Sequence, residues 1–164
     1  MAVLLGDKHR FAAEVGEWDD TLCRVDLWAA GQWLTCDDNM AFVKQFRLAV
    51  LNTAEWLRSG KGSPPPFTDL PPVATHKHLT LRAGDDDETE AEHELRGRFQ
   101  ALTWGPTTDN VTAYLFRDGD CLTITLQFWR EPPEQAAEIF VTEIPVAEFA
   151  ETLEDLVAVL DGVR

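Results

Sequence analysis

The fold of this chain is decided by one stretch, which opens Thr21-Leu22-Cys23-Arg24-Val25-Asp26-Leu27-Trp28-Ala29-Ala30-Gly31-Gln32-Trp33-Leu34-Thr35. Side chains alternate along a strand, so the odd-numbered residues from 23 to 29 face an apolar core and the even-numbered ones face the other way. Ala30-Gly31 is a turn signal, and residues 32–35 form a short second strand that pairs back onto the first. The stretch therefore predicts a hairpin with one buried face.

A helix is predicted directly after this hairpin, over about residues 39–59. The Asp-Asp-Asn run at 37–39 can accept hydrogen bonds from the first helical turn, where negative charge is also favourable. Apolar residues then recur at helical spacing from 42 to 57. A second helix is predicted over about 146–161, because Pro145 precedes an apolar stripe with helical period.

The other strands are indicated by short alternating segments between turn residues, at 3–5, 10–15, 76–83, 95–104, 111–116, 121–129 and 138–144. Hairpins connect most of them. We therefore predict an α+β fold, with a curved, mostly antiparallel sheet of about seven to eight strands and both helices packed on one face. The chain is expected to be a single domain over residues 1–164, with a proline-rich surface connection at 60–74 and an acidic loop at 84–94.

The composition favours a folded, acidic protein. The 164 residues are 45% hydrophobic and carry a formal net charge of −15, which argues against binding to DNA or to anionic membranes. No stretch has the features of a signal peptide or a membrane helix, so we expect a soluble cytoplasmic protein. The charge favours a basic partner, or serves solubility alone.

A binding surface is predicted on the sheet face turned away from the helices. Aromatic and arginine side chains set among neutral polar groups are typical of interface hot spots. Ordinary cross-strand packing explains the same pattern, and a homodimer through this aromatic face is a further alternative. The candidate binding residues on this face are Arg24, Asp26, Trp28, Arg96, Arg98, Tyr114, Gln127 and Trp129.

The predicted last helix is a second candidate surface. Glu151 and Glu154 lie outside its apolar stripe, in a C-terminal segment that is strongly acidic. Such a surface attracts a basic protein and can occupy a site built for phosphates. A solvated helix face that keeps the protein soluble is the alternative interpretation.

The sequence indicates no cofactor and no complete metal site. His76 and His78 would share one side of a strand, but zinc requires further ligands, so they remain weak metal candidates. Serine occurs only at Ser59 and Ser63, and no nucleophile motif is present. We therefore favour a non-catalytic protein-binding domain. A small-molecule or metal-dependent activity in a sheet pocket with His76 and His78 is the alternative, which leaves the question of an enzyme open.

The segment from Val25 to Thr35, followed by an acidic cap and a helix, resembles small uncharacterised acidic domains of high-GC bacteria. The chain is also similar in style to immunity proteins of polymorphic toxin systems, which are small, acidic and α+β, and which each bind one toxin. This resemblance implies a protein-binding role, as an immunity-type or adaptor protein. It assigns no role to any particular residue, because these families share no binding motif.

Overall fold

A computed structural model describes residues 2–128 and 138–162. The N-terminal sheet contains β1 (Val3–Asp7), β2 (Phe11–Asp19), β3 (Leu22–Ala29) and β4 (Gln32–Trp33) in that order, and β5 (Met40–Phe42) pairs with β3 beside β4. The second sheet contains β6 (Gln100–Ala101), β7 (Val111–Asp118), β8 (Cys121–Phe128) and β9 (Ile139–Pro145). The described helices are α1 (Val43–Arg58), α2 (Pro72–Thr80), α3 (Glu90–Phe99) and α4 (Val146–Asp161), and a 3₁₀ turn spans Pro106–Thr108.

The hairpin predicted from the opening stretch is confirmed. Ala30 and Gly31 have φ angles of 53° and 76°, as a tight turn between two antiparallel strands requires. Cys23, Val25 and Leu27 are completely buried on the inner side of β3. The alternation in the sequence therefore gives the correct faces of this strand.

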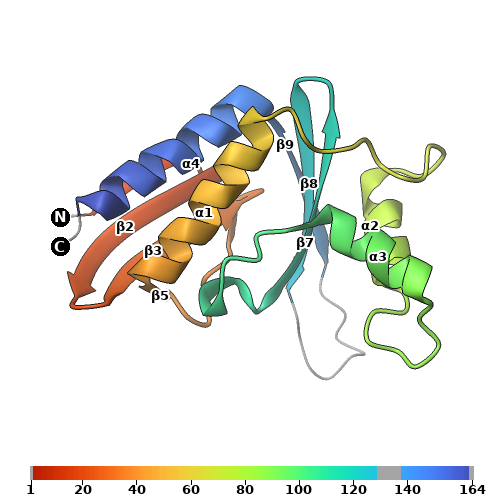
Figure 1. Cartoon of the computed structure of the whole chain (residues 1–164), viewed down its shortest axis with the longest axis horizontal. Coiled ribbons are helices and arrows are strands. Elements are labelled where there is room, and N and C mark those ends of the chain that lie inside the picture. The colour runs from red at the N-terminus through yellow and green to blue at the C-terminus, as the bar shows by residue number, and fades with distance from the viewer. Residues whose placement is uncertain (1, 129–137, 163–164) are drawn as a thin grey trace.

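The main core lies between the two sheets and the helices α1 and α4, which run side by side over the inner faces of β2 and β3 (Figure 1). The ring of Phe11 on β2 meets the ring of Phe149 on α4 edge to face, with centroids 4.9 Å apart. The predicted helix at 146–161 is confirmed. None of the described helices is long and apolar enough to cross a membrane.

The first helix begins four residues later than predicted, at Val43 rather than 39. Residues 40–42 instead form β5, which pairs with residues 22–24 of β3. Asp38 accepts a hydrogen bond from the N–H of Met40 at 2.9 Å, so its carboxylate stabilises the entry to a strand and not a helix start. Pairing with β3 thus overrides the local capping signal.

The predicted α+β class with antiparallel strands is confirmed, but the prediction of a single curved sheet with only two helices is wrong. The strands belong to two sheets, and the first parts of the segments predicted as strands at 76–83 and 95–104 are helical, since residues 76–80 belong to α2 and residues 95–99 to α3. Pro72 occupies the first turn of α2, where its missing N–H costs nothing. At the start of α3, Thr89 and Glu92 form a reciprocal capping box, so the helix takes up the last part of the predicted acidic loop.

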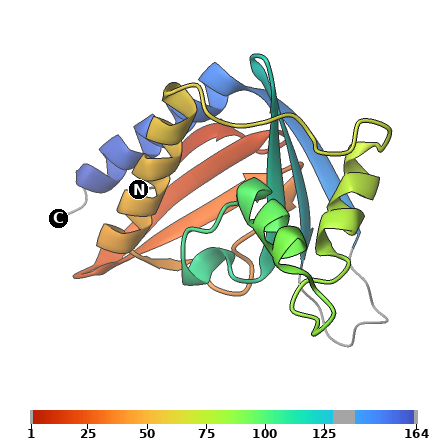
Figure 2. The same ribbon diagram turned by 45° about the vertical axis from the view of Figure 1, so that its right-hand side comes forward.

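The two additional helices cover the face of the second sheet that points away from the main core, as Figure 2 shows. A second, smaller core forms there from Leu79 of α2, Phe99 of α3, and Tyr114 and Phe116 of β7. The second sheet is therefore covered on both faces.

Candidate functional site

The face of the N-terminal sheet opposite α1 and α4 is the candidate site, and we call it the open face. Residues paired across antiparallel strands share a face, and the pairs here are Trp28 with Trp33, Asp26 with Glu14, and Arg24 with Met40. By the same pairing the open face comprises Leu4, Glu14, Leu22, Arg24, Asp26, Trp28, Trp33, Met40 and Phe42.

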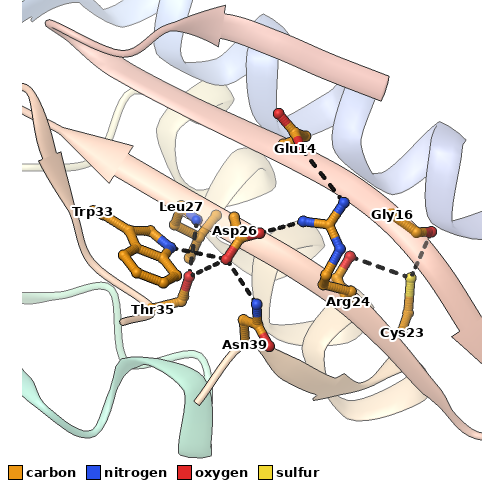
Figure 3. Close-up of polar contacts among 9 residues, drawn as sticks. All are labelled: Glu14, Gly16, Cys23, Arg24, Asp26, Leu27, Trp33, Thr35 and Asn39. Atoms are coloured by element: carbon orange, nitrogen blue, oxygen red, sulfur yellow. Dashed lines mark hydrogen bonds and ion pairs between the residues drawn. The ribbon is translucent and has the colours of Figure 1, made fainter. Parts of the chain in front are cut away.

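The carboxylate of Asp26 is the centre of a polar network on this face (Figure 3). Its Oδ1 accepts hydrogen bonds from Trp33 Nε1 at 2.9 Å, from Thr35 Oγ1 at 3.1 Å and from Asn39 Nδ2 at 3.1 Å. Its Oδ2 pairs with the guanidinium of Arg24. The network thus ties the connection between β4 and β5 back to the middle of β3.

Asp26 is held in its charged form. Only 5% of the residue is exposed, and burial by itself would raise the pKa of the carboxyl group. The hydrogen bonds from Trp33, Asn39, Thr35 and Arg24 outweigh burial and lower the pKa below its usual value. The carboxylate therefore stays ionised in the middle of this face, with both of its oxygens bonded.

The guanidinium of Arg24 extends across β2 and also reaches Glu14, at 3.4 Å. It can lie there because residue 16 is glycine, and a Cβ at this position would collide with the guanidinium. Gly16 therefore serves a close approach between a side chain and the neighbouring strand. The arginine is fixed in one orientation before any partner arrives, which lowers the entropy cost of using it in an interface.

Apolar side chains surround this network and remain exposed to solvent. The exposed fractions are 51% for Leu4, 45% for Trp33, 37% for Met40 and 52% for Phe42. Trp28 is half-buried, and the ammonium group of Lys8 lies 4.1 Å from its ring centroid. Tryptophan, methionine and arginine around one desolvated polar group match the composition of interface cores.

Carboxylates border the open face. Glu17 and Asp19 are exposed at the end of β2 and Asp20 in the turn that follows, and Asp37 and Asp38 are exposed in the connection to β5. Because the arginine on the face is already paired with Asp26 and Glu14, the surroundings have negative character.

The structure places only part of the predicted binding set on the open face. Arg24, Asp26 and Trp28 lie there, but Arg96 and Arg98 belong to α3 and not to a strand. Tyr114 is completely buried beneath α2 and α3, and Gln127 lies on the same covered face of the second sheet. Trp129 falls outside the described residues. The continuous aromatic face predicted across both sheets is therefore wrong.

The acidic last helix is partly neutralised. Glu154 forms a two-pronged ion pair with Arg58 of α1, with hydrogen bonds of 2.7 and 3.1 Å that lower the pKa of its carboxyl group. Glu148 pairs with Arg10, whose Nη1 donates to both carboxylate oxygens at 2.9 and 3.0 Å. Glu151, between them, is exposed on α4. These pairs attach α4 to its neighbours.

The two candidate metal ligands lie on different sides of α2, because residues two apart on a helix do not face each other. His76 is buried against β8, with Nδ1 2.7 Å from Thr125 Oγ1, and burial lowers its pKa to about 4 although the Gln127 side chain acts in the opposite direction. His78 instead packs edge to face against Phe67, with ring centroids 4.4 Å apart. Within the described residues, no group of three or more His, Cys, Asp or Glu side chains could hold a metal ion.

The sequence analysis missed six residues of the open face, namely Leu4, Glu14, Leu22, Trp33, Met40 and Phe42. The position of Trp33 could have been predicted from the sequence, because a short strand that pairs back across Ala30-Gly31 must place Trp33 opposite Trp28. The positions of Met40 and Phe42 could not be predicted from the sequence, since they depend on the pairing of β5 with β3.

No protein-family model matches the chain, and no curated protein matches its sequence significantly. Among solved structures, CdiI from Burkholderia dolosa AUO158 superposes on 95% of this chain and 99% of its own, with a TM-score of 0.57 and 14% identity. The chain has a CdiI-like fold. At this identity the likeness concerns the fold alone, and the superposition includes nearly the whole of both chains.

Proposed function

We propose that this protein is an immunity-type protein that binds and neutralises a basic protein partner through the open face. The observation that carries the proposal is the open face itself, with exposed Leu4, Trp33 and Met40 arranged around the fixed pair of Arg24 and Asp26. Fold likeness supports it, since CdiI is the immunity protein of contact-dependent growth inhibition. Such a protein would act in the cytoplasm.

Charge complementarity selects the class of partner. The chain has 29 acidic residues against 14 lysines and arginines, and exposed carboxylates border the open face. An acidic border speeds the association of a basic protein, and the apolar centre then supplies the contact area that slows dissociation. The partner we propose is therefore a basic toxin domain of the kind that acts on nucleic acid.

A test in cells follows from this proposal. A protein captured by this chain from its own host is expressed alone in a laboratory strain, then together with the wild-type chain or with the Leu4→Lys/Met40→Lys variant. We expect the captured protein to stop growth, the wild-type chain to restore it, and the folded variant to fail. Two results would refute the proposal: a captured protein that is harmless, or equal rescue by both forms.

The metal-dependent alternative loses its geometric basis, because His76 and His78 are on opposite sides of α2. A homodimer through the open face would use the same exposed side chains. Light scattering over a dilution series separates it from the proposal, since a monomer at every concentration is expected for an immunity-type protein that leaves this face available.

A further inference from the structure

A groove of about 450 Å³ lies between α1 and the segment that runs from the end of α3 to Trp104. It shares no residue with the open face. Its floor is apolar and includes Phe99, Trp104 and Leu115, which are at most 6% exposed. Two hydrogen bonds fix Trp104, because its Nε1 donates to Thr53 Oγ1 at 3.0 Å and its carbonyl oxygen accepts from Gln45 at 3.2 Å. The floor is therefore a rigid apolar surface.

The rim of the groove carries an arginine whose charge is not used within the described part of the protein. Seven other described arginines have a carboxylate or carbonyl partner: Arg10, Arg24, Arg47, Arg58, Arg82, Arg96 and Arg117. Arg98 is exposed and has no such partner among residues 2–128 and 138–162. In a chain with a net charge of −15, an arginine beside an apolar floor is suited to an incoming carboxylate.

Two residues that line the groove go against the intrinsic preferences of the chain. Gly97 lies in the last turn of α3, although glycine is unfavourable in a helix and a Cβ there would meet no atom within 4 Å. Leu102 is buried yet adopts a left-handed φ of 58°, a conformation that disfavours side chains. Residues with unfavourable backbone conformations or low helix propensity that gather at one site are typical of functional regions.

We propose that this groove binds an extended peptide segment of a protein partner, in which an apolar side chain rests on the floor and a neighbouring aspartate or glutamate pairs with Arg98. A peptide suits the site better than a small molecule does, because rim residues such as Asn52, Trp56 and Thr103 are exposed. A site this open cannot enclose most of a small ligand's surface. The acidic segment differs in charge from the basic partner proposed for the open face, so the two proposals stand independently.

The test uses a phage-displayed library of random dodecapeptides selected against the whole chain. Enriched peptides are then measured against three variants by fluorescence titration. Gly97→Phe adds a bulky side chain to the groove lining at a position where a Cβ would meet no atom within 4 Å, and Arg98→Glu reverses the charge at the rim. Lys77→Glu on α2 makes the same charge change at an exposed position away from the groove. Melting temperatures show that each variant is folded.

We expect enriched peptides to place an apolar residue within two positions of Asp or Glu. Their affinity should fall about tenfold or more in Gly97→Phe and in Arg98→Glu, and stay unchanged in Lys77→Glu. Failure to enrich any peptide, enrichment of basic peptides, or equal loss of affinity in Lys77→Glu would overturn the proposal. Tight binding of octanoate, with displacement of the peptides, would also overturn the proposal. That result would indicate a site for small carboxylates.

Discussion

The two sheets of this protein use their outward faces in opposite ways. On the N-terminal sheet the outward side chains of β3 form a bonded polar network with exposed apolar residues around it. On the second sheet the outward side chains of β7 are covered by α2 and α3 and form a core of their own. The outward face of the N-terminal sheet is thus available for a partner, while that of the second sheet is covered by helices of the same chain.

The largest contrast is expected between Phe116→Ala and Met40→Ala. Phe116 is 1% exposed although it points outward, so its truncation should cost about 3–5 kcal/mol of unfolding free energy, as in a core. Met40 is 37% exposed, and its truncation should cost about 1 kcal/mol or less. Urea denaturation of both variants measures the difference. Similar costs would mean that the two faces are not distinct.

Asp26→Ala should destabilise the open face by about 3 kcal/mol, because it leaves the donors of Trp33, Asn39 and the buried Thr35 without their acceptor and Arg24 without its main partner. The control is Asp38→Ala, which removes one exposed hydrogen bond to Met40 and should change stability by less than about 1 kcal/mol. Thermal and urea unfolding check both values. A small loss in Asp26→Ala would show that the network is not structural.

The packing of α2 on the second sheet should be sensitive to acid. His76 has a pKa of about 4 in the folded protein against 6.5 when unfolded, so the unfolded chain binds more protons between these values. Stability should therefore be unaffected above pH 6.5 and fall progressively as the pH drops to 4, by at most about 3 kcal/mol. Unfolding free energies measured from pH 7 to 4.5 test this.

His76→Gln is the matched control for the pH prediction, because an amide can still bond to Thr125 and does not titrate. Between pH 6.5 and 5 its stability should stay nearly constant, since the carboxylates with lowered pKa values, Asp26, Glu88, Glu92 and Glu154, lose their contribution only at lower pH. The same slope in both proteins would contradict the assignment to His76.

The smallest expected effect concerns the start of α3. Thr89→Ala removes the side-chain half of the capping box and should cost about 1 kcal/mol. Hydrogen exchange should be faster at the first amides of α3 and unchanged in β3, since α3 packs on the second sheet and β3 belongs to the N-terminal sheet. Faster exchange in both regions would mean that the covers of the two sheets are coupled.

The sequence predicted best where local pattern and tertiary structure agree. The hairpin of β3 and β4 and the helix α4 could be predicted, because each combines a clear period of apolar residues with a turn or a proline at its boundary. The strand predicted at 95–104 failed because the capping box of Thr89 and Glu92 was overlooked, although its spacing is visible in the sequence. The start of α1 failed for another reason, since β5 depends on long-range pairing with β3.

For the candidate site, alternation placed Arg24, Asp26 and Trp28 on the correct face but could not show which faces are covered. A signal was present in β7, where Ala113, Tyr114, Leu115 and Phe116 are apolar on both sides of the strand. Such a run is typical of a strand buried on both faces, whereas β3 alternates with charges. The helices that cover β7 lie earlier in the chain, so their docking follows from tertiary structure alone.

The open face is the surface proposed to hold the partner. The decisive measurement is the dissociation constant of the captured partner with Leu4→Lys/Met40→Lys and with Leu48→Lys/Leu81→Lys. The second pair makes the same chemical change at leucines that are 54% and 71% exposed and lie outside the open face. We predict a loss of about a hundredfold or more for the first pair and little change for the second. Equal losses, or a greater loss for the second pair, would contradict the account.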